Sequence, residues 1–205
     1  MKRDISTALI LLFTSGTFSA LPQSPSPRPR SDTLTESGQI TANGRTASYV
    51  IHHLPPSSFP DLPTSIAASV AARGCVIPQT YEAHRPENVV HASLERTGSD
   101  DWALLCSKNG TVALMVFFAS APDHPIVLAS AQETERLQTH SPDQALGFNW
   151  GIDPASPKQI HTAQIGLPHR PAQPDHDALA DSIIDHKTVY HLYSNGKWTL
   201  VDLPE

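Results

Sequence analysis

The segment PDHDALADSIIDH, residues 174–186, gathers aspartates and histidines whose side chains can do chemistry. Carboxylates on alternate residues of a turn supply the oxygen ligands that calcium prefers. Carboxylates near an imidazole can also hold a catalytic metal or act as general acid and base. This acidic segment is therefore the first candidate for a functional site.

A helix over residues 175–186 would separate these side chains. At about 100° per residue, Leu179 and Ile183 define an apolar face, and the aspartates lie on a stripe well to one side. His176 and His186 lie on or beside the apolar face, so one helix does not bring histidine and carboxylate together. Aspartates four residues apart also repel one another, so basic side chains from elsewhere or a hard cation would have to offset their charge.

A different alignment favours the cation. The spacing Asp175-x-Asp177-Ala178-x-x-Asp181 matches the calcium-loop pattern D-x-D-G-x-x-D, with alanine at the glycine position. The same spacing occurs earlier, over residues 95–101, as Glu95-x-Thr97-Gly98-x-x-Asp101. There it leads directly into an apolar pair of strands.

In this arrangement the chain resembles the FG-GAP or VCBS type of repeat, in which a calcium loop precedes two strands. The stretches GCVIPQ, NVVHASLERTGSDDWALLCS and HDALAD are also similar to uncharacterised secreted bacterial proteins. The resemblance implies a calcium site at Asp175, Asp177 and Asp181. Thr97 departs from the repeat, which has Asp there, and a complete propeller does not fit this length.

Three interpretations of the acidic segment stay open: a calcium loop, a solvated acidic helix or turn, and the metal site of a hydrolase completed by a distant histidine. The chain has no G-x-S-x-G, H-E-x-x-H, C-x-x-C or phosphate-binding glycine motif, which disfavours the common hydrolase, zinc-protease, redox and nucleotide classes. The histidines are dispersed. The adjacent pair His52 and His53 would point to opposite faces of a strand and would not bind one metal together.

Two further residues are candidates for ligand binding. Trp150 lies between polar residues in FNWGID, which suits stacking on a carbohydrate or lining a peptide groove, or else a buried anchor. Arg85 lies in a loop before an apolar strand, where it lines a pocket or forms a surface pair with Glu87.

The first 20 residues have the basic start and short apolar run of a secretory signal peptide, and the run is too short to cross a bilayer. Residues 21–46, rich in Pro and Ser, predict a disordered leader. Cys75 and Cys106 then predict a disulfide, since exported thiols are normally oxidised. We expect an exported bacterial protein, periplasmic or extracellular, without a stable membrane anchor. A net charge of −6 argues against nucleic-acid binding.

The predicted helices and strands form one α+β domain over residues 47–205, which would position these residues. We expect a mainly antiparallel sheet of five to seven strands with two or three short helices. Strands are predicted at 47–54, at three places within 88–118, at 125–130 and around 133–138, and a hairpin turns at Asn195-Gly196. Helices are predicted at 63–73 and 156–164.

The hairpin that turns at Asn109-Gly110 should be the core. Its predicted register pairs Trp102 with Phe117 and Leu105 with Leu114, and both of its faces are largely apolar. The sequence predicts the function less closely than the fold. The sequence favours a non-enzymatic binding or envelope-associated module with a protein, peptide or carbohydrate partner. The alternative is a metal-dependent hydrolase that uses Asp175, Asp177 and Asp181.

Overall fold

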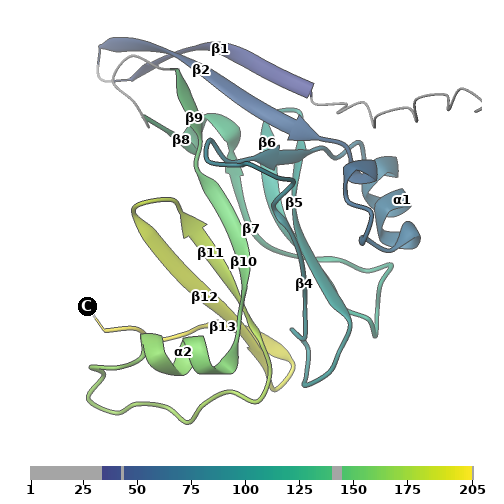
Figure 1. Ribbon diagram of the computed structural model, residues 1–205, viewed down its shortest axis with the longest axis vertical. Helices are drawn as coiled ribbons and strands as arrows, with labels where there is room; N and C mark the ends of the chain where they lie inside the picture. Colours follow the sequence, from purple (N-terminus) through teal and green to yellow (C-terminus); the bar gives the residue numbers. More distant parts are fainter. Residues whose placement is uncertain (1–33, 43, 140–144, 205) are drawn as a thin grey trace, which may run out of the picture. The chain divides into compact units, whose positions relative to one another are not determined.

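The computed structural model describes residues 34–42, 44–139 and 145–204 (Figure 1). The expected signal peptide and residues 21–33 of the expected leader lie outside this range. The described part is sheet-rich with two α-helices, in keeping with the α+β class. The expected number of strands is wrong, because thirteen strands form three sheets within the described residues.

The first sheet has the order β1-β2-β9-β8, and β3 also pairs with β2. Its strands are β1 Leu34–Ala42, β2 Arg45–Leu54, β3 Ile77–Gln79, β8 Leu137–Gln138 and β9 Leu146–Phe148. β2 confirms the strand expected at 47–54. β1 lies inside the expected leader, so strand structure begins before residue 47, where the domain was expected to start. Pairing with β2 along its whole length supplies hydrogen bonds to one edge of this polar strand.

The second sheet has the order β4-β5-β6-β7, and all its neighbours are antiparallel. Its strands are β4 Val89–Ala92, β5 Asp101–Lys108, β6 Thr111–Phe117 and β7 Ile126–Gln132. The predicted register of the central hairpin is confirmed: Trp102 faces Phe117 and Leu105 faces Leu114. Residues 101–107 are all buried, as expected for a strand covered on both sides.

Two core clusters cover the two faces of this sheet. Leu105 and Leu114 pack in one cluster with residues of the other two sheets, and Leu104 packs in the second with the buried side of helix α1, Thr64–Ala72. This helix confirms the one expected at 63–73. Gly74 follows it with φ +77°, a conformation that glycine adopts without strain.

The predicted disulfide is present. It joins Cys75, directly after α1 and Gly74, to Cys106 on β5. The second predicted helix is confirmed as α2, Pro157–Ala163, where Ser156 and Gln159 form a capping box. Two short 3₁₀ turns, η1 Pro56–Ser58 and η2 Glu133–Glu135, complete the helical elements of the described residues. η2 stands where a strand was expected to begin.

The third sheet has the order β10-β11-β12-β13, with β10 Trp150–Ala155, β11 Ala178–Ile183, β12 Lys187–Ser194 and β13 Lys197–Leu200. The last two strands form the hairpin predicted at Asn195-Gly196. The helix considered for residues 175–186 is wrong, because Ala178–Ile183 is a strand. Leu179 packs into the main core while Ala180 packs in a cluster with α2, so this apolar run is covered on both faces.

Among residues 34–42, 44–139 and 145–204, no helix combines the length and apolar character needed to cross a bilayer.

Candidate metal centre

The centre is built around Glu133, a carboxylate that the fold places in the interior. β7 ends at Gln132, and the chain turns into η2, where Gln132 and Glu135 form a capping box. The backbone N–H of Glu133 donates to the carbonyl oxygen of Gly110 at 2.8 Å. This turn directs the Glu133 side chain inward, where the residue is only 2% exposed. A carboxylate so deeply buried needs partners.

Two side chains bond the same oxygen of Glu133. His53 Nε2 lies 2.7 Å from Oε1, and Ser107 Oγ donates to Oε1 at 2.5 Å. An ionised carboxylate can only accept, so the proton of the first contact is on His53 Nε2. The second oxygen, Oε2, is buried and has no hydrogen-bond partner among the described residues. Glu133 therefore keeps an unused acceptor in the interior.

The charge of Glu133 is maintained against burial. Burial alone would raise the pKa of its carboxyl group, but the hydrogen bonds from His53 and Ser107 and the attraction of His53 together hold that pKa below its usual value. His53 and Glu133 thus form a buried hydrogen-bonded pair in which Glu133 is the acceptor. Such pairs are well satisfied only when the remaining lone pairs also find partners.

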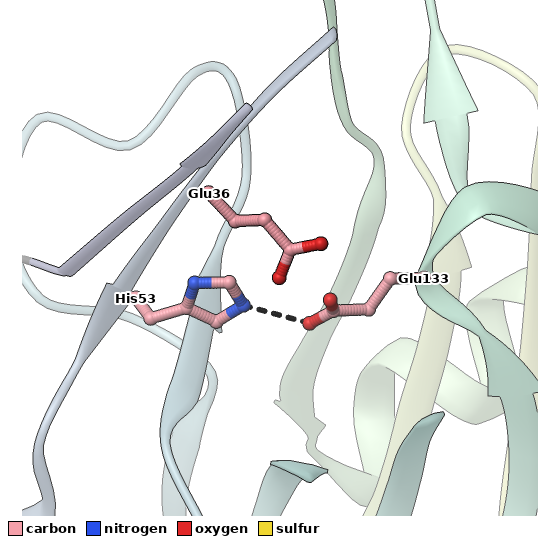
Figure 2. Close-up of side chains that lie close together, drawn as sticks. All are labelled: Glu36, His53 and Glu133. Atoms are coloured by element: carbon pink, nitrogen blue, oxygen red, sulfur yellow. Dashed lines mark hydrogen bonds and ion pairs between the residues drawn. The ribbon is translucent and has the colours of Figure 1, made fainter. Parts of the chain in front are cut away.

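Glu36 supplies a third ligand group from β1. It lies opposite Ile51 in the β1–β2 register, on the strand face that His53 shares. One potential ligand atom from each of Glu36, His53 and Glu133 lies within 4.8 Å of the others, and Figure 2 shows the three side chains pointing toward one another. Glu36 is exposed, and its Oε1 accepts a hydrogen bond from Tyr49 at 3.3 Å. Burial and the nearby Glu36 charge raise the pKa of Tyr49, so this phenol donates.

The centre opens toward a cavity of about 240 Å³. Glu36, His53 and Ser107 line it together with Gly74, Val76 and Lys108. Zinc binds nitrogen and carboxylate oxygen at about 2.0–2.2 Å, so an ion would have to draw the three ligand atoms together by about 1 Å. Glu36 can supply most of that movement because it is exposed. The arrangement offers three protein ligands and an open side.

The aspartates predicted as a calcium site do not share such an arrangement. Asp181 accepts from Trp150 Nε1 at 2.7 Å and lies 3.1 Å from His191 Nε2, while Asp177 accepts from the Ser93 N–H. Asp175 lies 2.6 Å from His176 Nδ1, and that hydrogen bond lowers the pKa of its carboxyl group. Glu36, His53 and Glu133 form the one group of three potential metal ligands found in the described ranges.

The two predicted loops instead contact each other. Thr97 donates from Oγ1 to the carbonyl oxygen of Asp175 at 2.6 Å, and Asp177 and Ser93 exchange two hydrogen bonds. Asp101, at the end of the first predicted loop, is completely buried. Its carboxylate accepts the backbone N–H groups of the loop itself. Protein donors and acceptors therefore make the contacts between and within the two loops.

The two candidate ligand-binding residues have different environments. Trp150 is fully buried, with Arg136 4.4 Å above its ring, and is therefore the buried anchor among the two alternatives. Arg85 is exposed and lines two surface cavities, of about 430 and 550 Å³. No ion pair joins it to Glu87, which instead accepts the Thr80 N–H.

Tyr81 borders the smaller of these two cavities and provides a test of the local electrostatics. Burial and the hydrogen bond to Asp185, at 3.0 Å, raise the pKa of Tyr81 to about 12. The contribution of the protonated Tyr81 phenol to the free energy of unfolding is fully present below pH about 10, the pKa in the unfolded chain. It is lost as the pH rises through about 12, the pKa in the folded protein. We expect Asp185→Asn to lower the pKa of Tyr81, measured by absorbance near 295 nm with Tyr81→Phe identifying the signal. An unchanged titration would contradict this assignment.

Few features of the sequence pointed to the candidate metal centre. His53 stood out only through its contrast with His52, and the structure confirms that the two face opposite ways: His52 is exposed and bonds Thr35, while His53 is buried. Glu133 belongs to no motif, and Glu36 lies in the expected leader. The available signals were a histidine on one predicted strand and an acidic residue shortly after the end of another.

No match was found when the chain was compared with protein-family models, with curated proteins and with solved structures. The resemblance to FG-GAP or VCBS repeats therefore stays a prediction. Function has to be argued from the geometry of this molecule alone.

Proposed function

We propose that this protein is an exported binding module that holds a divalent transition-metal ion at Glu36, His53 and Glu133. One observation carries the proposal: the buried oxygen Oε2 of Glu133 has no partner, although a histidine and a second carboxylate lie beside it. A cation would satisfy that oxygen and would also balance two neighbouring carboxylates. Export is supported by the Cys75–Cys106 disulfide, which is typical of an oxidising compartment.

The ligand set favours zinc over calcium. Calcium takes six to eight oxygen ligands, whereas this centre offers one imidazole nitrogen and two carboxylates. One nitrogen and two oxygens with an open fourth position suit Zn²⁺. A metal-bound imidazole nitrogen carries no proton, so an ion at His53 Nε2 would replace the proton that this atom donates to Glu133 Oε1. Ser107 would act from outside the ligand shell, because its hydroxyl orients the Glu133 carboxylate by bonding Oε1 and leaves Oε2 for the ion.

Titration calorimetry with Zn²⁺ tests the proposal on the wild-type protein and on Glu36→Gln. Glu36 is exposed, so this variant should fold normally while losing one of three ligands. We expect wild type to bind about one ion and Glu36→Gln to bind at least about tenfold more weakly. Zinc should also raise the melting temperature of wild type by several degrees, since a ligand specific for the folded state stabilises it.

The matched control is His52→Gln. His52 is the exposed neighbour of His53 on the opposite face of β2, and it would account for adventitious binding to a surface histidine. Its substitution should leave zinc affinity unchanged. Absence of zinc binding by wild type, or equal affinity of wild type and Glu36→Gln, would refute the proposed centre.

A further inference from the structure

The proposed centre is divided between two sheets. Glu36 and His53 lie on β1 and β2 of the first sheet. Ser107 lies on β5 of the second sheet, and Glu133 directly follows β7 of the same sheet. The hydrogen bond between His53 and Glu133 therefore crosses from one sheet to the other. The geometry of the centre depends on how firmly the two sheets are held together.

A short segment around Cys75 joins these sheets next to the centre. β3 pairs with β2 so that Pro78 lies opposite His53. Val76, just before β3, exchanges two backbone hydrogen bonds with Ser107, at 3.0 and 2.8 Å. The disulfide from Cys75 to Cys106 reinforces this contact one residue earlier on each strand. It is a covalent link between the sheet that holds His53 and the sheet that holds Glu133.

The same segment forms the wall of the cavity at the metal centre. Gly74 and Val76, on either side of Cys75, line the cavity, and so does Ser107, which follows Cys106. Ser107 in turn donates to Glu133. The pairing of β5 with β6 holds Ser107 in register, so the disulfide acts on the wall: without it, one pair of backbone hydrogen bonds between Val76 and Ser107 would remain at this point to hold the Gly74–Val76 wall against β5. Such a pair can open far more readily than a covalent bond.

We propose that reduction of the Cys75–Cys106 disulfide releases the metal from the centre, so that the protein delivers its ion in response to a dithiol reductant. This inference rests on the proposed metal function. The reductant transfers two electrons and two protons: the S–S bond breaks, two thiols form, and the reductant becomes a disulfide. The linkage is reciprocal, so the bound ion also opposes reduction by the same factor that the disulfide contributes to metal affinity.

Zinc titration of the double variant Cys75→Ala/Cys106→Ala tests metal release without thiols that would bind zinc themselves. We expect the folded variant, checked by circular dichroism, to bind Zn²⁺ at least about tenfold more weakly than oxidised wild type. Equal affinity would overturn the coupling while leaving the metal centre intact. Absence of binding by wild type would instead overturn the proposed function.

A second measurement uses the disulfide of the wild-type protein and decides the question if the double variant does not fold. The ratio of disulfide to dithiol at equilibrium in glutathione redox buffers is measured with and without Zn²⁺, for wild type and for Glu36→Gln. Zinc should raise this ratio several-fold in wild type and have much less effect in Glu36→Gln, because the linkage applies to the equilibrium. The thiols that form on reduction bind zinc in both proteins, so this effect cancels when the two are compared. An equal effect of zinc on the two proteins would overturn the coupling.

Discussion

Replacing His53 with alanine should lower the free energy of unfolding by about 3–5 kcal/mol, measured by urea denaturation in metal-free buffer. The substitution removes the imidazole that donates to a carboxylate only 2% exposed, and among the described residues it leaves Ser107 as the one hydrogen-bond donor to Glu133. The carboxylate then keeps one protein donor in place of two in a buried position. Because domains are stable by only about 5–15 kcal/mol, this is one of the largest effects that a single substitution can have here.

Two variants separate loss of the hydrogen-bonded pair from simple loss of packing. His52→Ala removes the same side chain from the neighbouring exposed position and should change stability by less than about 0.5 kcal/mol. His53→Leu/Glu133→Leu replaces the pair with apolar side chains and should be more stable than His53→Ala, since no charge is left unpaired. A His53→Ala variant as stable as His52→Ala would show that Glu133 carries no buried charge.

Local sequence patterns predicted those strands and helices whose turns or caps lie within a few residues of them. The hairpins at Asn109-Gly110 and Asn195-Gly196 were placed correctly, with their registers, because a two-residue turn fixes every cross-strand pair that follows it. Helix α2 was placed from the cap at Ser156 and the proline after it. In each case the turn or cap is encoded beside the element that it defines.

Patterns failed where neighbours in space decide the structure. The run around Leu179 is apolar over a few residues, and such a run fits a helix and a doubly covered strand equally well. Pairing with β10 and β12 makes it a strand. β1 was missed because its polar sequence gains order only from pairing with β2. Strands as short as β8, Leu137–Gln138, carry no periodicity at all.

The candidate metal centre could not be predicted from the sequence for the same reason. His53 and Glu133 are 80 residues apart in the chain, and their contact depends on how two sheets meet. The aspartates that attracted attention are close in sequence but lie on a strand and its approaches, where each finds a separate partner. Spacing along the chain identifies a site only when one element or one loop presents all the ligands.

Asp101→Ala should destabilise the fold by at least about 3 kcal/mol, which would shift the melting temperature by roughly 10 °C. Asp101 is completely buried at the start of β5. Its carboxylate accepts the backbone N–H groups of Leu94, Glu95 and Ala119, at 2.7–2.9 Å, and the hydroxyl of Ser99 is also bonded to it. Alanine leaves these donors without an acceptor, and the loop before the central hairpin loses its anchor.

Asp100→Ala is the matched control, because Asp100 is the exposed neighbour whose carboxylate bonds only His91. This substitution should lower the free energy of unfolding by less than about 1 kcal/mol. Asp101→Asn keeps the size and one acceptor oxygen, so it should fall between the two alanine variants. Adding Ca²⁺ to metal-free wild-type protein should leave its melting temperature unchanged, because protein donors already occupy the Asp101 oxygens. A rise of several degrees with Ca²⁺ would instead indicate that an ion organises this loop, and would make the loss in Asp101→Ala a loss of metal.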